Sequence, residues 1–243
     1  MASLKQFLKW VFKAVDIDVK RRSTVSNPSY QLLRGLRKFN INLVLDVGAN
    51  TGQFASGLRS FGFEEKIVSF EPLSDAFNSL SRRALSDPNW QVHARGAVGD
   101  FDGEIEINIS GNSVSSSVLP MEEAHLSAAS NSAYVGSENV PICKLDSIAT
   151  DYISNSTCCF LKMDVQGFEW QVLDGAKDTL KQVQGVLCEM SLVELYKNQK
   201  LWLDLIKRFE LEGFTLWALQ NGFTDPRDGR TLQVDGIFFR IAN

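Results

Sequence analysis

The chain has 243 residues and a formal net charge of −4, a length that fits one domain with a substantial core better than two small domains. Its acidic balance argues against a nucleic-acid partner, which usually meets a basic face. No apolar run approaches the roughly 20 residues that span a bilayer. The four cysteines form no C-x-x-C pair, which indicates reduced thiols in a cytoplasmic protein rather than a zinc knuckle or a disulfide framework.

Residues 1–39 are predicted to form a basic, helical N-terminal extension. Apolar side chains recur there at helical spacing, at Leu4, Phe7, Leu8, Val11, Phe12 and Val15. Lysines on the other side of this helix interrupt what would be the apolar core of a signal peptide, which argues against such a peptide. Such a helix packs on the body of the protein or on a second copy in a homodimer, which we favour, or it makes a peripheral membrane contact. A second short helix is predicted from Ser29 to Phe39, with Pro28 near its first turn.

The second part, residues 40–243, alternates apolar strands with amphipathic helices. Strands are predicted at 41–47, 66–71, 90–94, 159–164, 185–190, 214–219 and 236–241. This alternation is typical of an α/β fold in which helices cover both faces of a mostly parallel, Rossmann-like sheet. Asn221-Gly222 and Arg227-Asp228-Gly229 are turn signals between the last two strands, which are therefore expected to form an antiparallel hairpin. The sequence predicts a sheet of about seven strands.

The regular alternation stops between about residues 101 and 142. Glu104 to Ile109 alternates polar and apolar residues, as in a half-exposed strand, and a serine-rich loop follows from Ser110 to Ser117. From there to about Val140 the residues are small and polar, with weak periodicity. We therefore expect an irregular insertion, which in compact domains is usually a lid, a binding loop or a disordered segment.

The first strand runs into a glycine turn and a helix, the arrangement that binds nucleotides in doubly wound sheets. Dinucleotide enzymes use G-x-G-x-x-G there, whereas this chain has only Gly48 and Gly52, with Asp46 in the strand before the turn. A carboxylate at that position would repel a pyrophosphate but could meet the cationic end of S-adenosylmethionine, directly or through water. Glu71 ends the second strand and can accept both hydroxyls of a ribose. The combination favours S-adenosylmethionine as the cofactor.

Several motifs together resemble one family. They are LDVGANTGQF at 45–54, SFEP at 69–72, AVGD at 97–100, KMDVQGFEWQVLDGA at 162–176, the serine-rich NSVSSS and the C-terminal VDGIFFR. In order and spacing this pattern is similar to the FkbM family of S-adenosylmethionine-dependent methyltransferases over roughly residues 40–241. The resemblance implies a class I methyltransferase fold and methyl transfer to a hydroxyl of a sugar, a glycan or a small natural product. Gln166 stands where the family typically has Glu, which puts a catalytic role at that position in doubt.

The predicted cofactor contacts follow from the corner and the resemblance: Asp46, Gly48, Ala49, Asn50, Thr51, Gln53, Phe54, Glu71, Pro72, Ala97 and Asp164. Asn50 or Thr51 could instead cap the following helix. Asp164 ends the fourth predicted strand and is the first candidate for the base that removes the hydroxyl proton, or for a group that positions the substrate or holds the cofactor amino group. His125, in the insertion, could swing over the site as a base, against the alternative of a solvated loop histidine.

Metal-assisted catalysis is a less favoured alternative. Asp164 and Glu189 end neighbouring predicted strands, so two oxygen ligands and water could hold Mg²⁺ and activate a bound hydroxyl. Met190 and Ser191 follow Glu189, in place of the further acidic or amide ligand that such a site uses. A cofactor-binding protein without catalysis, or a nucleic-acid methyltransferase, remain the alternative functions. The acceptor itself carries no motif in this sequence.

Overall fold

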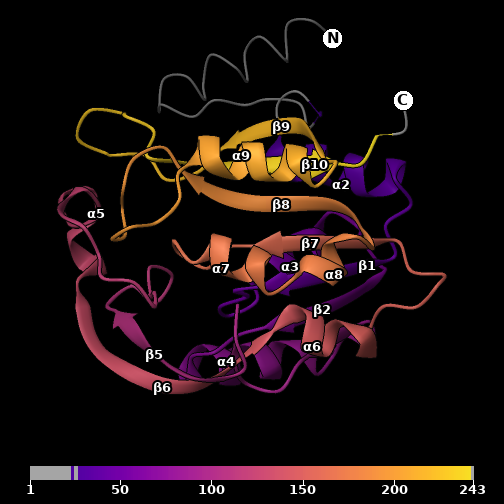
Figure 1. Ribbon diagram of the computed structural model, residues 1–243, viewed down its shortest axis with the longest axis horizontal. Helices are drawn as coiled ribbons and strands as arrows, with labels where there is room; N and C mark the ends of the chain where they lie inside the picture. Colours follow the sequence, from indigo (N-terminus) through magenta and orange to yellow (C-terminus); the bar gives the residue numbers. More distant parts are fainter. Residues whose placement is uncertain (1–22, 25–26, 242–243) are drawn as a thin grey trace, which may run out of the picture.

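The computed structural model describes residues 23–24 and 27–241, and the predicted amphipathic helix in residues 1–22 lies outside them. Seven strands form one twisted sheet in the order β3-β2-β1-β7-β8-β10-β9 (Figure 1). Their bounds are β1 Leu43–Val47, β2 Lys66–Phe70, β3 Trp90–Val92, β7 Cys159–Met163, β8 Val183–Ser191, β9 Thr215–Asn221 and β10 Gln233–Phe239. The predicted class I methyltransferase sheet is thereby confirmed.

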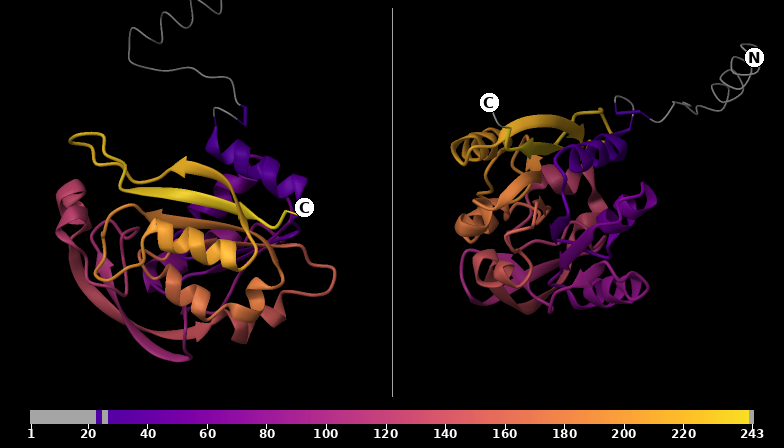
Figure 2. Two further views of the ribbon diagram at one scale, coloured as in Figure 1. Left: turned by 45° about the horizontal axis from the view of Figure 1, so that its top comes forward. Right: turned by 90° about the vertical axis from the view of Figure 1, so that its right-hand side faces the viewer.

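Helices cover both faces of the sheet (Figure 2). Leu36, Leu58 and Leu80 bring α2, α3 and α4 against one face, where they share a core with Val44. Leu145, Leu173 and Phe209 bring α6, α7 and α9 against the other face. The helices are α2 Pro28–Lys38, α3 Gln53–Ser60, α4 Ser74–Ala84, α6 Leu145–Ile148, α7 Glu169–Asp174, α8 Lys177–Leu180 and α9 Trp202–Leu211, and short 3₁₀ turns lie at Ser130–Ser132 and Ala149–Asp151.

Strand β1 is the centre of the sheet. It pairs in parallel with β2 on one side and with β7 on the other, so that Val47 lies opposite both Phe70 and Met163. The carboxyl ends of these three strands therefore meet at one edge, which is where ligands bind in open α/β sheets. At the far end, β10 runs antiparallel to both β8 and β9. The predicted C-terminal hairpin is confirmed.

Successive side chains of β1 point to opposite faces, as the pleat of a strand requires. Leu43, Leu45 and Val47 belong to the core under α6–α9, whereas Val44 belongs to the core under α2–α4. Asp46 therefore points with Val44 into the α2–α4 face. All five residues of the strand are buried, which explains the continuous apolar run and makes the single carboxylate within it unusual.

A second sheet replaces the irregular insertion that the sequence predicted. Strands β4 (Ala97–Gly99), β6 (Tyr134–Lys144) and β5 (Gly103–Ser110) form a three-stranded sheet in that order, and α5 (Glu123–Ala128) lies between β5 and β6. Ile107, Val140 and Ile142 pack its inner face against Leu73 and Phe168 of the main domain. The predicted half-exposed strand from Glu104 to Ile109 is confirmed as β5. The prediction that the rest of 101–142 is irregular is wrong, because β6 is mostly exposed and has no regular apolar period.

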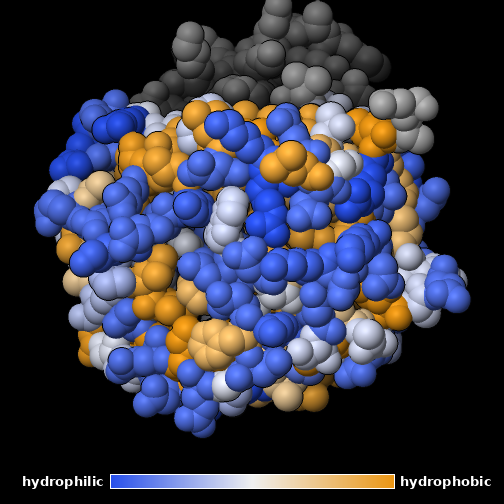
Figure 3. Space-filling view, viewed as in Figure 1, coloured by the Kyte–Doolittle hydropathy of each residue, from blue (hydrophilic) through white to orange (hydrophobic). Residues whose placement is uncertain are grey.

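The surface carries both hydrophilic and hydrophobic residues. The face shown in Figure 3 is mainly hydrophilic, with hydrophobic residues scattered among charged ones. Within the part of the chain that the structure describes, no helix is long and apolar enough to cross a bilayer.

Candidate active site

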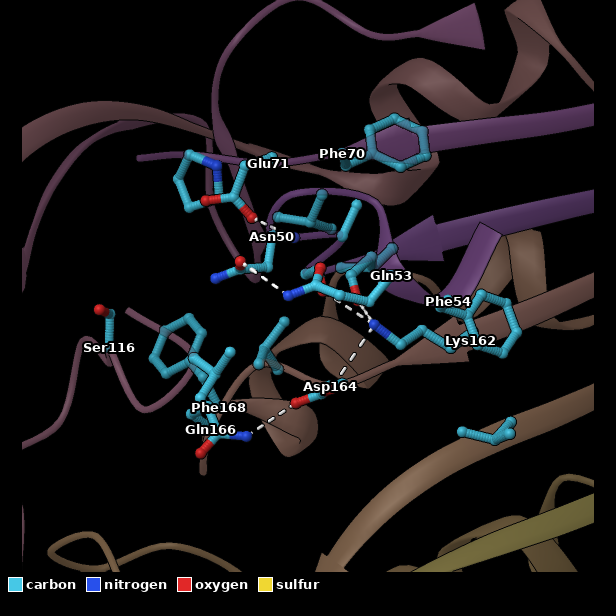
Figure 4. Close-up of a pocket in the computed structure, with 18 of the residues that line it drawn as sticks. Asn50, Gln53, Phe54, Phe70, Glu71, Ser116, Lys162, Asp164, Gln166 and Phe168 are labelled. Atoms are coloured by element: carbon cyan, nitrogen blue, oxygen red, sulfur yellow. Dashed lines mark hydrogen bonds and ion pairs between the residues drawn. The ribbon is translucent and has the colours of Figure 1, made fainter. Parts of the chain in front are cut away.

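A cavity of about 580 Å³ opens at the carboxyl ends of β1, β2 and β7 (Figure 4), a volume typical of small-molecule sites. The glycine corner after β1 and the end of β2 form one wall. The loop after β7 forms its floor, and the serine-rich loop at 113–118 forms the opposite wall. The cavity continues past Lys162 toward Asp235 and the ends of α2 and β9. One cavity therefore joins the nucleotide-binding corner to a second, acidic region.

The corner depends on glycine at position 48. Gly48 has a φ of +74°, a conformation that side chains disfavour. A Cβ atom there would lie 1.9 Å from the carbonyl oxygen of Asp164. Gly48 thus lets β1 and the loop after β7 approach each other closely. Asn50 also has a positive φ, of 47°, and together these turns aim the backbone at the cavity.

Glu71 points its carboxylate into the corner. Its Oε2 accepts a hydrogen bond from the Asn50 backbone N–H at 2.7 Å, and its Oε1 accepts one from Leu73 N–H at 2.9 Å. Each oxygen retains a lone pair for a ligand hydroxyl. Burial raises the pKa of Glu71 to about 7, with Asp46 adding to the shift, although the two backbone bonds and Lys162 oppose it. The side chain is held in place before a ligand arrives.

Most of the predicted cofactor residues surround this cavity. They are Gly48, Ala49, Asn50, Gln53, Phe54, Glu71, Pro72, Ala97 and Asp164. Thr51 does not line it, and its N–H bonds the Asn50 side chain at 2.8 Å. Phe70, Leu73, Val98 and Phe168, which the sequence did not single out, add apolar walls on which a purine ring can lie.

Asp46 does not reach the cavity. Its side chain is fully buried, it accepts a hydrogen bond from Ser69 Oγ at 3.1 Å, and its Oδ1 lies 3.2 Å from Lys162 Nζ. The predicted direct contact of this carboxylate with the cofactor is wrong, because the strand pleat points it beneath α3 and away from the cavity lining. Lys162 covers it instead. The contact through water stays a prediction.

Lys162 is the residue that sequence reasoning missed. It is the last residue but one of β7 and begins the motif at 162–176. Its ammonium donates to the Gly48 carbonyl at 2.8 Å and lies 3.7 Å from Asp164 Oδ2. Burial lowers the pKa of Lys162, but Asp46 and Asp164 outweigh that effect and hold the pKa above its ordinary value. The ammonium is therefore a fixed positive charge between the Asp46 carboxylate and the cavity, and Figure 4 shows it directed toward Asp164. The sequence feature that could have indicated its importance is a lysine within an otherwise apolar strand.

Gln166 joins the acids at the ends of β7 and β8. Its Nε2 donates to Asp164 Oδ1 at 2.7 Å and to Glu189 Oε2 at 2.6 Å, and its Oε1 accepts from Tyr196 Oη at 2.7 Å. Asp164 and Glu189 are thus neighbours, as predicted. Asp164 lines the cavity, whereas Glu189 does not. Burial, followed by Asp164, raises the pKa of Glu189 well above its ordinary value.

Side-chain amides bridge these acids. Besides Gln166, the amide of Gln233 donates to the same Glu189 oxygen at 2.8 Å. The described residues contain no group of three or more His, Cys, Asp or Glu side chains arranged to hold a metal ion. The Mg²⁺ alternative stays a prediction without a ligand set in this part of the chain.

His125 is not a loop residue over the site. It lies in α5, is 3% exposed, and packs against Tyr196 and Phe223 with ring centroids at 5.2 and 5.3 Å. It does not line the cavity, and burial lowers its pKa to about 4. Both the solvated loop and the swinging base are wrong for this residue, because α5 buries its ring against Tyr196 and Phe223.

The serine-rich loop is ordered as well. Ser117 Oγ donates to the Gln166 carbonyl at 2.6 Å, and Ser116 Oγ accepts from Ser110 N–H at 3.0 Å. Ser116 and Ser117 line the cavity. The loop is therefore a wall tied to the floor after β7.

Comparison with known sequences identifies the family. The family model described as the methyltransferase FkbM domain matches residues 46–216. These residues include the glycine corner, Glu71, Lys162 and Asp164. The chain belongs to the FkbM methyltransferase family. It is accordingly a methyltransferase, and the resemblance noted from its motifs is confirmed.

The chain is also similar to individual known proteins. The chain is 28% identical to the 2-O-methyltransferase NoeI of Sinorhizobium fredii (strain NBRC 101917 / NGR234) over 187 residues, which are 70% of this chain and 72% of that protein. Among solved structures, an rRNA methylase from Streptococcus thermophilus matches with a TM-score of 0.48 and 11% identity, covering 90% of this chain and 100% of that one. The methyltransferase domain of bacterial CtHen1-C matches with a TM-score of 0.45 and 11% identity, with coverage of 90% and 100%.

Proposed function

We propose that this FkbM methyltransferase transfers a methyl group from S-adenosylmethionine to a hydroxyl oxygen of a sugar, a glycan or a similarly hydroxylated small molecule. The observation that carries the proposal is the single cavity that joins the Gly48 and Glu71 corner to an acidic region at the ends of β7 and β10. A cofactor and an acceptor can lie in it side by side. The similarity to a 2-O-methyltransferase supports oxygen as the acceptor atom.

The residues of the corner fit the cofactor. Glu71 offers one free lone pair on each carboxylate oxygen, which suits the two hydroxyls of a ribose. The backbone at Gly48 and Asn50 lies open to the cavity, and Ala97 with Phe168 offers apolar walls for the adenine. When bound, S-adenosylmethionine supplies an electrophilic methyl group carried on a sulfonium sulfur.

Asp164 is the carboxylate at the junction of the two regions. Its side chain is 38% exposed, and it lines the cavity beside the Gly48 corner. Because Asp46 is sealed beneath Lys162, Asp164 is the acid that can receive the cationic amino group of the cofactor or orient the acceptor. Gln166 and Lys162 fix its position from two sides.

The acidic region suits a neutral, hydrogen-bonding acceptor. Asp235, Gln220 and Asn221 line it together with apolar residues of α2 and α3, including Leu32 and Leu58. Carboxylate and amide groups accept and donate hydrogen bonds to a polyol, and apolar walls pack on the C–H faces of a ring. A polyanionic nucleic acid would meet repulsion from the carboxylate of Asp235.

The test is methyl transfer by the purified full chain from methyl-labelled S-adenosylmethionine to free hexoses, 6-deoxyhexoses and hexosides, with tRNA and rRNA as separate arms. We expect label in a sugar, at an oxygen located by mass spectrometry. Label confined to the RNA arms would reject the proposal in favour of nucleic-acid methylation. Tight S-adenosylhomocysteine binding without turnover on any acceptor would support a cofactor-binding protein without catalysis.

A further inference from the structure

Three acids lie on one face of the sheet at the acidic end of the cavity. Leu187 of β8 lies opposite Lys162 of β7 and Ile237 of β10. Because side chains two residues apart share a face, Asp164, Glu189 and Asp235 all project toward the α2–α4 side. Asp235 pairs directly with Glu189 across the β8–β10 register. The three carboxyl groups therefore lie on the same face of the sheet. Their hydrogen-bond partners determine which of them is available to a ligand.

Two of the three are already bound by neighbouring donors. Glu189 Oε2 accepts from the amides of Gln166 at 2.6 Å and Gln233 at 2.8 Å, and Glu189 does not line the cavity. Asp164 accepts from Gln166 at 2.7 Å and forms an ion pair with Lys162 at 3.7 Å. Both oxygens of Asp164 thus already face a donor from this chain. Asp164 is thus suited to holding a charge or a hydroxyl in place.

Asp235 is different. It lines the cavity, is only partly buried, and accepts no hydrogen bond from any residue that the structure describes. Its neighbours in the sheet are Glu189 on β8 and Gln220 on β9, and it interacts electrostatically with Asp164, Lys162 and Glu189. Burial, followed by Asp164, raises the pKa of Asp235 to about 6, while Lys162 opposes the shift. Such a carboxyl is ionised at neutral pH and remains basic enough to take a proton.

We propose that Asp235 is the general base of the methyl transfer, and that Asp164 positions the reactants beside it. This inference rests on the function proposed above. As the acceptor oxygen bonds to the methyl carbon, the S–CH₃ bond breaks and its electron pair stays on sulfur, which leaves S-adenosylhomocysteine. The hydroxyl proton passes to an oxygen of Asp235 and is later released to water. Gln220 and Asn221, at the end of β9 beside Asp235, are placed to orient the acceptor ring.

The kinetic test compares Asp235→Asn with the wild type on the sugar acceptor found in the transfer assay. We expect kcat to fall by roughly 10²–10⁴-fold, the usual contribution of a general base, while calorimetry shows S-adenosylhomocysteine binding within about twofold of wild type. The wild-type kcat should rise with pH through about 6, and this limb should be absent in Asp235→Asn. Asp75→Asn, which removes an exposed carboxylate from α4, is the matched control and should keep the wild-type profile.

A second readout needs no acceptor. Carboxyl ¹³C NMR of aspartate-labelled protein, with the Asp235 signal assigned by its loss in Asp235→Asn, should give a titration midpoint near 6. A midpoint at the ordinary aspartate value near 4 would overturn the inference, and so would full kcat in a folded Asp235→Asn. If wild type transfers no methyl group to any hydroxyl, the proposed function fails instead, and the two failures are thereby distinguished.

Discussion

The ammonium of Lys162 lies 3.2 Å from the carboxylate of Asp46 in the interior of the sheet, directly beneath the cavity. The Asp46 side chain is fully buried and that of Lys162 is 5% exposed. Removing one partner of a buried pair leaves the other charge without compensation. Lys162→Met should therefore lower the free energy of unfolding by about 3–5 kcal/mol, measured by urea denaturation.

Two further variants test the cause. Asp46→Leu combined with Lys162→Met removes both charges, and it should recover most of the lost stability. Lys181→Met breaks the exposed ion pair with Asp178, at 2.7 Å, and should leave stability unchanged within error because water screens it. Equal losses for the single and double variants at 46 and 162 would contradict the buried-pair account.

The second prediction about stability concerns Gly48. Gly48→Ala places a Cβ 1.9 Å from the Asp164 carbonyl oxygen in a left-handed backbone conformation. We expect thermal unfolding at a clearly lower temperature, with a loss of more than about 2 kcal/mol from strain and displaced backbone. Gly57→Ala is the matched control, since it lies in α3 with open space around the new Cβ. It should stabilise the protein by about 0.5–1 kcal/mol, and destabilisation of both variants alike would contradict this reasoning.

Local periodicity was sufficient to predict the main sheet. β1, β2 and β7 are buried on both faces, so each appears as a continuous apolar run between turn signals. The glycine corner and Glu71 were predictable for a related reason, because their roles follow from backbone geometry after a strand. Gly213 is a further position whose role follows from backbone geometry, since it has a φ of +85° just after the end of α9.

The second sheet and the charge pairing were not predictable in this way. β6 contains Gly136 and Pro141 and is largely exposed, so its structure comes from pairing with β5 rather than from its own pattern. Lys162 and Asp46 are far apart in the chain, and only the parallel register of β1 and β7 brings them together. Asp235 comes one residue before the last predicted strand and was not singled out, because a sequence pattern does not say which carboxyl group is left without a hydrogen-bond donor.

Gln166 should matter for stability rather than for proton transfer. Its amide bonds Asp164, Glu189 and the buried hydroxyl of Tyr196. Gln166→Leu leaves these polar groups short of a partner and should cost about 1–3 kcal/mol in urea denaturation. Gln91→Leu, at an exposed position of β3, should cost much less. An unchanged midpoint for Gln166→Leu would show that the bridge contributes nothing.

Cofactor binding should depend on pH through Glu71. Its folded pKa is raised to about 7, and only the ionised carboxylate can accept both ribose hydroxyls, so protons compete with the ligand as pH falls through this value. Affinity for S-adenosylhomocysteine should therefore drop about tenfold from pH 8 to pH 6. Glu71→Gln should bind more weakly at both values and lose this dependence. The same pH dependence in Glu71→Gln would assign it to another group.

The most direct test of the account is calorimetric titration of the full chain at pH 8 with S-adenosylhomocysteine and, separately, with NAD. We predict that S-adenosylhomocysteine binds at one site, that NAD does not bind, and that Glu71→Ala weakens the binding by at least about tenfold, since hydrogen bonds to a charged group contribute about 1.5–3 kcal/mol. Absence of S-adenosylhomocysteine binding, or undiminished binding by Glu71→Ala, would contradict the assignment of this corner as the cofactor site.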